Sequence, residues 1–397
     1  TQRAFGDEVQ AAVPIRRAKV TDMLGGGTDS AYSVLHKGIP VLALAAALAV
    51  FFIKLAQGVG VFAGLSAFSC VLCICSPAMF ALCTSFGTYK AVKSLIRSGS
   101  MIAGYDAAME FVDLDALVVD QTELFAKDEV QLQGIKMFGD NRIDDAILLC
   151  ASVLANTGGP LYKSFLRMID NRTEILLDLK NLVYEEGMGY AAWFEGGRRV
   201  LIGNAALMES HDILLPVEDY EAKLGKTGKK VMYVADRGRL IAFFVAEYQF
   251  KPQYRRYAKQ LDKYAITLLV KGYDPNIDQQ MLERMFGAPE KQVRLVSKAA
   301  SDYYEDHVVP PQTVAAGAYT TSGLTGMVKL VLMCEKLRST VFAAHFFAIA
   351  SCVFGAFLSV ISNASGMFYE MSTWQALVYQ LIWTLPALAF FFLKGRE

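Results

Sequence analysis

Two pairs of long apolar runs limit the folds open to this chain. Residues 38–53 carry no charge, and after Lys54 the chain stays uncharged from Leu55 to Tyr89. A helix needs about 20 apolar residues to cross a bilayer, where every backbone polar group must be satisfied within the protein. Together with the later apolar runs, these segments predict four membrane-spanning helices, at roughly 38–56, 60–84, 340–361 and 373–392.

The rest of the composition indicates a large water-soluble part. Of the 397 residues 54% are hydrophobic and 20% are charged, and charges concentrate between residues 90 and 338. Lys plus Arg equals Asp plus Glu at 39 each, so no basic excess indicates a nucleic-acid partner. Basic residues flank the apolar pairs on the side of the soluble part. The positive-inside rule then places the soluble domains and both termini in the cytoplasm. We expect an integral protein of the plasma membrane.

The seven cysteines do not indicate a secreted disulfide framework, because most of them lie within the apolar runs. The chain opens on Thr1 and shows no signal peptide. We therefore expect a fragment of a longer protein or an edited sequence.

The soluble part alternates between two kinds of periodicity. Residues 114–119 and 266–270 read as buried parallel strands. Residues 190–201 and 230–247 alternate and turn at glycine-containing loops, as antiparallel hairpins do. Helices are predicted at 144–155, 161–169 and 252–264. The pattern predicts an α/β domain interrupted by an α+β insertion.

Two short motifs carry candidate chemistry. The strand at Val118 and Val119 ends in Asp120-Gln121-Thr122, and an Asp-x-Thr at a strand end is typical of a phosphate-accepting aspartate. The second apolar run contains Cys73-Ile74-Cys75-Ser76-Pro77, in which a proline interrupts helical hydrogen bonding and two thiols are potential ligands for a soft cation. The alternative for the cysteines is packing between helices as small hydrophobic side chains.

The order of these parts resembles the heavy-metal (CPx-type) branch of the P-type ATPases. The resemblance implies four transmembrane helices, a cytoplasmic HAD-like (Rossmannoid) α/β P domain and an inserted α+β N domain of the nucleotide-binding type. It begins after the place of the family's actuator domain, whose TGE loop has no counterpart in the sequence. The implied ranges are an N-terminal segment 1–37, a helix pair 38–89, P-domain parts 90–126 and 251–338, an N domain 127–250, a helix pair 339–393 and a tail 394–397.

The phosphorylation segment matches the family only in part. In the family the aspartate of DKTGT attacks the γ-phosphate of ATP. Asp120 and Thr122 match, but Gln121 replaces the lysine and Glu123 replaces the glycine. A carboxylate beside an incoming phosphate repels it.

The expected phosphate loop is also altered, since Lys271-Gly272-Tyr273-Asp274 stands where the family has TGDN. In one interpretation, Lys271 supplies the missing positive charge and Asp274 supplies a displaced carboxylate. In the other, which we favour, the two residues form an exposed, solvated pair. The Mg²⁺-binding GDGxND has no counterpart between Arg294 and Met327, where nearby acids are expected on a solvated helix face.

The insertion carries a nucleotide-type pattern. Gly187-Met188-Gly189 and the later Gly203-Asn204 resemble the family's nucleotide-binding residues, whereas its His-Pro dipeptide appears as Gly159-Pro160. The alternative is a hairpin that keeps its turn glycines for structural reasons.

Three hypotheses follow. The first is a catalytically degenerate relative with a binding or regulatory role. The second is an active ATP-driven heavy-metal transporter that uses Asp120, with ATP, Mg²⁺ and a soft metal cation as the implied ligands. The third is a scaffold or partner subunit of another membrane protein. The implied partners are the lipid bilayer, a nucleotide, and a second membrane subunit or an actuator domain.

Overall fold

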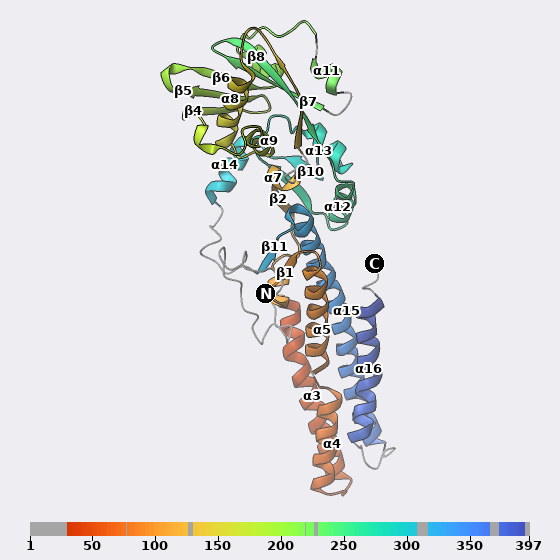
Figure 1. The fold of residues 1–397 in the computed structure, drawn as a ribbon. Coiled ribbons are helices and arrows are strands. Elements are labelled where there is room, and N and C mark those ends of the chain that lie inside the picture. The colour runs from red at the N-terminus through yellow and green to blue at the C-terminus, as the bar shows by residue number, and fades with distance from the viewer. Residues whose placement is uncertain are drawn as a thin grey trace. The chain divides into compact units, whose positions relative to one another are not determined.

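The computed structural model divides the chain into two compact units. Unit 1 combines Thr1–Asp113 with Pro310–Glu397, and unit 2 is Leu114–Val309. Both units are drawn in Figure 1, and each is described here by itself. The structure describes residues 30–76, 78–125, 130–218, 220–225, 229–307, 317–365 and 373–393.

Unit 1 is built from long apolar helices. They are α3 (Ser30–Ala56), α4 (Val61–Ile74), α5 (Ala78–Ile96), α15 (Gly323–Ala364) and α16 (Thr373–Leu393). Over the described residues, three segments are long and apolar enough to cross a membrane, namely Gly38–Ala56, Val61–Ile96 and Gly323–Ala364. They cover three of the predicted spans. The fourth predicted span coincides with α16, which is not among these three, so the count of four stays a prediction.

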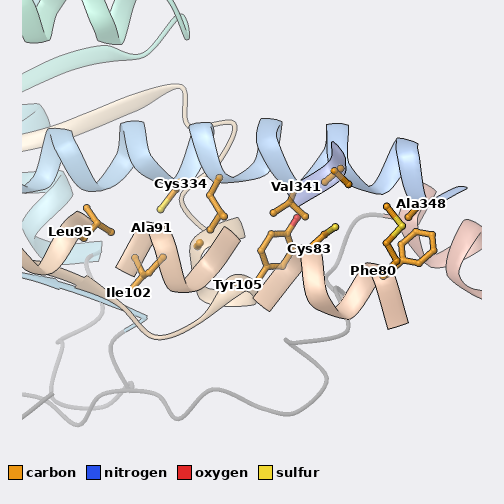
Figure 2. Packing of buried hydrophobic residues seen from close by; sticks show 14 of the residues in the cluster. Phe80, Cys83, Ala91, Leu95, Ile102, Tyr105, Cys334, Val341 and Ala348 are labelled. Carbon is orange, nitrogen blue, oxygen red and sulfur yellow. The ribbon is translucent and has the colours of Figure 1, made fainter. Parts of the chain in front are cut away.

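The core of unit 1 lies where α5 packs against α15. Figure 2 shows Phe80 and Cys83 of α5 facing the helix that carries Val341 and Ala348. Val341, Cys83 and Ala348 are fully buried. Small residues allow two helices to approach closely, which is the usual way in which membrane helices associate.

A short sheet closes unit 1 beside these helices. Strand β1 (Ser100–Ile102) pairs antiparallel with β11 (Ala318–Thr320), and α6 (Tyr105–Met109) follows β1. After α6, the backbone N–H of Asp113 donates to Glu335 Oε1 at 2.9 Å, and Arg338 donates to the Asp113 carboxylate at 2.5 Å. These contacts tie Asp113, the last residue of the first part of unit 1, to α15. The start of the P domain at residue 90 stays a prediction.

Unit 2 contains a parallel sheet with the strand order β10-β9-β2. Strands β2 (Ala116–Asp120) and β9 (Thr267–Lys271) are direct parallel neighbours, which confirms the two predicted parallel strands. The remaining elements around this sheet are β10 (Val293–Leu295), α7 (Gln121–Leu124), α12 (Gln253–Asp262), α13 (Gln279–Phe286) and α14 (Lys298–His307).

Between β2 and β9 the chain forms a six-stranded antiparallel sheet with the order β3-β8-β7-β6-β5-β4. The predicted insertion and both predicted hairpins are therefore confirmed. Its strands are β3 (Val130–Met137), β4 (Leu179–Glu185), β5 (Gly189–Phe194), β6 (Arg199–Gly203), β7 (Lys229–Asp236) and β8 (Arg239–Tyr248). Its helices are α8 (Ile143–Ala155), α9 (Pro160–Met168), α10 (Ala205–Ser210) and α11 (Tyr220–Gly225), with 3-10 turns at Thr173–Ile175 and Glu195–Gly197.

Candidate functional site

Asp120 stands at the carboxyl end of β2, where parallel strands present functional side chains. It is the N-cap of the short helix α7, because its Oδ1 accepts from the Thr122 backbone N–H at 2.8 Å and from the Thr122 hydroxyl at 2.7 Å. The Asp120 side chain is 39% exposed. The two predicted residues, Asp120 and Thr122, are therefore hydrogen-bonded to each other through Oδ1, and the second carboxylate oxygen, Oδ2, is left for other contacts.

Lys271 faces that second oxygen from the neighbouring strand. Asp120 and Lys271 are register partners in the parallel pair, and Lys271 Nζ lies 3.7 Å from Asp120 Oδ2. The same ammonium donates to Glu305 Oε1 of α14 at 2.7 Å. Burial lowers the pKa of Lys271, but the hydrogen bond to Glu305 and the charges of Glu305 and Asp120 outweigh it and raise the pKa. One ammonium thus serves two carboxylates.

Gln121 points inward, away from this ion cluster. It is 2% exposed, and its Oε1 accepts from the Asp274 backbone N–H at 2.9 Å. The fit is tight, since a Cβ on Gly272 would lie 2.4 Å from that same oxygen, and Gly272 has φ +144°. At the position where the resemblance implies a lysine, the chain holds a neutral amide that joins the first residue of α7 to the loop after β9.

Asp274 is buried, which corrects the expectation of an exposed, solvated pair with Lys271. Its carboxylate is covered because the loop packs beneath the inserted sheet: Tyr248 OH donates to Asp274 Oδ2 at 2.8 Å, and the Asn276 N–H donates to Oδ1 at 3.0 Å. Burial raises the pKa of Asp274 to about 6. Burial, followed by the charge of Asp274, also raises the pKa of Tyr248, which stays a hydrogen-bond donor.

The inserted domain reaches this loop at further points. Tyr190 OH donates to the carbonyl of Tyr273, and a Cβ on Gly159 would lie 3.9 Å from Asp274 Cβ. The sequence does not reveal that the altered phosphate loop is enclosed. These contacts join residues that are far apart in the chain, and no local pattern encodes them.

The acids of α14 were predicted on a solvated helix face, and the structure gives two of them partners at the site. Asp302 Oδ1 accepts from Tyr273 OH at 2.6 Å, and Glu305 accepts from Lys271. Their spacing of three residues on one helix was the available signal, since residues i and i+3 lie on one face.

The four residues of the nucleotide-type pattern divide into two kinds. Gly187 and Asn204 line a cavity of about 740 Å³ in unit 2, together with Lys229, Lys230, Asp278 and Arg284. Gly189 and Gly203 are register partners at the β5–β6 pair. A Cβ on Gly203 would lie 2.2 Å from the Met188 carbonyl, and one on Gly189 would lie 2.3 Å from the Ile202 carbonyl. Glycine is therefore required at positions 189 and 203 because the backbones of β5 and β6 approach too closely for a side chain.

The membrane cysteines do not converge. Cys73 is exposed whereas Cys75 is buried, so the Cys-x-Cys pair does not share one face of α4. Cys75 Sγ contacts the Cys352 carbonyl at 3.5 Å, and Cys352 Sγ contacts the Cys75 carbonyl at 3.6 Å. Pro77 lies outside the described residues. Across the part of the chain that the structure describes, no group of three or more His, Cys, Asp or Glu side chains is arranged to hold a metal ion.

The chain resembles known proteins in sequence over about half its length and in fold over nearly all of it. No protein-family profile matches it. It is 27% identical over 191 residues, 48% of this chain, to a copper-transporting P-type ATPase of Rhizobium leguminosarum bv. viciae. Its fold is similar to that of a zinc-transporting PIB-type ATPase, with a TM-score of 0.50, 14% identity and 99% of this chain covered. A second structure of a zinc-transporting PIB-type ATPase, in a different state, has a TM-score of 0.46, 14% identity and the same 99% coverage.

The chain spans only part of these proteins. The match covers 22% of the copper-transporting ATPase and 66% of the zinc-transporting structure.

Proposed function

The chain is a relative of the heavy-metal, CPx-type P-type ATPases, and from this premise we propose that it is a catalytically degenerate member with a binding or regulatory role. The observation that carries the proposal is the ion cluster at Asp120. Lys271 is shared by Asp120 and Glu305, while Gln121 is buried as a neutral amide.

Phosphoryl transfer depends on positive charge that offsets the charge developing on the transferred group. Here one ammonium faces two carboxylates, so the cluster keeps a net negative charge before any nucleotide phosphate arrives. The loss of a single preorganised donor typically costs about 3 kcal/mol of barrier, a hundredfold or more in rate. The lysine after the aspartate, the phosphate loop and the Mg²⁺-binding carboxylates of the family pattern are altered together, so turnover by the standard route should be negligible.

We expect no phosphoenzyme in this chain. The purified membrane protein is incubated with γ-labelled ATP, Mg²⁺ and a series of copper, zinc and alkali-metal salts, quenched in acid and examined for protein-bound label. Wild type and Asp120→Asn should be indistinguishable. Acid-stable label that is present in wild type and lost in D120N would overturn the degenerate assignment.

The binding role rests on the cavity beside Gly187 and Asn204. Its volume of about 740 Å³ is in the range of small-molecule sites, and Lys229, Lys230 and Arg284 outnumber the acids Glu221 and Asp278 in its wall. We propose that it takes a nucleotide without hydrolysing it. Lys230 is already paired with Asp278, whereas Arg284 is exposed at the end of α13, so Arg284 is the side chain best placed to meet a phosphate.

Replacing Arg284 with glutamine should therefore weaken ATP binding about fivefold, the equivalent of about 1 kcal/mol for one exposed charge-assisted contact. Titration calorimetry of the full chain in detergent measures the dissociation constant. Arg256→Gln is the control, because Arg256 is an exposed arginine of α12 that does not line the cavity. Equal affinities for R284Q and R256Q would count against this cavity as the nucleotide site.

One observation favours the second candidate function, an active heavy-metal transporter. Lys271 lies 3.7 Å from Asp120 Oδ2, within reach of a phosphoryl group on that residue, so it is a candidate for the missing positive charge. In this alternative Asp120 remains the phosphate acceptor, ATP and Mg²⁺ are cofactors, and Cys73 and Cys75 with Pro77 handle a soft cation. The acid-quench experiment separates the two functions.

The remaining placements are also proposals. We propose a HAD-like P domain, four spans and a plasma-membrane location. The basic residues that flank the apolar runs support soluble domains and termini in the cytoplasm. A second membrane subunit or an actuator domain is the proposed protein partner. Stable co-purification of another chain tests it.

A further inference from the structure

One buried amide in the wall of the unit 2 cavity is in a position to meet a ligand. Asn276 lines this cavity of about 740 Å³ and is only 3% exposed. Its amide stands beside the Asp274 carboxylate, but in the part of the chain that the structure describes no acceptor lies within hydrogen-bond distance of Asn276 Nδ2. Buried side-chain donors are nearly always paired with protein, water or a ligand. This donor is therefore available to an oxygen of a molecule in the cavity.

Two cations lie in the same wall. Lys229, the first residue of β7, is half-buried, and Arg284 of α13 is exposed. Lys230 of the same strand already has a partner, because its ammonium is paired with the Asp278 carboxylate. An ammonium, a guanidinium and an amide N–H all donate hydrogen bonds, and the two cations add charge, so together they match the oxygens of a phosphate chain.

The polar groups of the nucleotide-type pattern are engaged within the chain. Asn204 Nδ2 donates to the Gly187 carbonyl at 2.8 Å, and Asn204 Oδ1 accepts from the Leu207 N–H at 3.2 Å. The Gly187 N–H donates to the Tyr184 hydroxyl at 3.4 Å. A protein distinguishes one base from another through hydrogen bonds to the polar edge of the base. Groups that hold their own turn and helix cap do not supply that discrimination.

Part of the cavity wall is apolar and accepts any base. Val231, Met281 and Phe250 line it, and Phe250 is 40% exposed. Every base has a π-face, so contact with an aromatic ring stabilises all bases to a similar degree. The discriminating polar groups of the cavity thus lie where a phosphate chain is met, and the apolar groups add affinity without selecting a base.

We propose that the cavity recognises a nucleoside triphosphate through its phosphate chain, with Asn276 as the buried donor, and that it does not select the base. This inference rests on the nucleotide role proposed above and adds which part of the ligand is recognised. The ligand class is therefore any nucleoside triphosphate, whichever base it carries.

Partial ligands test this proposal without any substitution. Titration calorimetry of the full chain in detergent should give dissociation constants for ATP, GTP and CTP that agree within about threefold. Inorganic tripolyphosphate should displace ATP, whereas adenosine should not. An affinity for ATP more than about twentyfold above that for GTP, or displacement by adenosine and not by tripolyphosphate, would overturn base-independent recognition. If no triphosphate binds to wild type, the nucleotide role itself is wrong.

Asn276→Leu locates the recognition at the buried amide. Leucine is similar in size but donates no hydrogen bond, so ATP and tripolyphosphate should each bind about tenfold more weakly to N276L. Asn181→Leu is the control, because Asn181 is an exposed asparagine of β4 that does not line the cavity. Equal affinities of N276L and N181L would contradict the role of Asn276. If N276L does not fold, the comparison of ligands in wild type still decides the proposal.

Discussion

Gly203→Ala is expected to destabilise the inserted sheet by about 4 kcal/mol or more, the largest stability loss that we predict. The added Cβ would lie 2.2 Å from the Met188 carbonyl and 2.9 Å from the Cα of Gly189. Neither contact is to a flexible side chain, so β5 and β6 must separate and lose hydrogen bonds of their ladder. Urea denaturation of the full chain, followed by Trp193 fluorescence after Trp374 and Trp383 are changed to phenylalanine, measures the effect.

Gly134→Ala is the matched control. Gly134 lies in β3 of the same sheet, and a Cβ there meets nothing within 4 Å. The control should change the free energy of unfolding by less than about 1 kcal/mol. If G203A were as stable as G134A, the close approach of β5 and β6 would not be the reason for the glycine pattern, and a direct role of Gly203 in binding would become the better explanation.

The second large effect is a pH dependence of stability that originates at Asp274. Its pKa is about 6 in the folded chain and 3.8 as the ordinary value. The folded protein therefore binds this proton more tightly than the unfolded chain does. The resulting stabilisation is complete below pH 3.8 and is lost as the pH rises through 6. A shift of this size corresponds to about 3 kcal/mol.

Asp274→Asn should remove this pH-dependent contribution to stability. The unfolding free energy of D274N minus that of wild type should increase by about 3 kcal/mol as the pH rises from about 4 to about 7. Chemical denaturation at a series of pH values measures it, and Asp302→Asn serves as the control because Asp302 is an exposed carboxylate of the same site. Parallel pH profiles for wild type and D274N would show that Asp274 titrates in the folded protein as it does in the unfolded chain.

The parts of the fold that the sequence predicted are those with strong local patterns. The parallel strands at 116–120 and 267–271, the helix from Ile143 to Ala155 and the two hairpins of the insertion all lie where the periodicity placed them. Period 2 and period 3.6 are properties of consecutive residues, so they can be recognised without a structure. Asp120 was also identified, because it ends an apolar strand in an Asp-x-Thr motif, and Lys271 was identified from the place that the family resemblance gives to the phosphate loop.

Burial and partners were predicted less well. Asp274 was expected to be solvated and instead lies under Tyr248 of the inserted sheet. Glu305 lies on an exposed helix face, as predicted, but its ion pair with Lys271 was not predicted. In each case an ordinary polar residue acquires its role from a contact with a segment tens of residues away, and nothing in its immediate neighbours distinguishes it.

By itself, the sequence determined that part of this chain is apolar enough to span a membrane, that Asp120 ends a buried strand, and that its supporting residues depart from the family pattern. These follow from composition, periodicity and motif, which are local. Only the tertiary structure decided what replaces the missing groups. Gln121 is buried against the Asp274 backbone, and Lys271 is shared between Asp120 and Glu305. The physical reason is that buried polar groups must be paired, and their partners are chosen by packing in three dimensions.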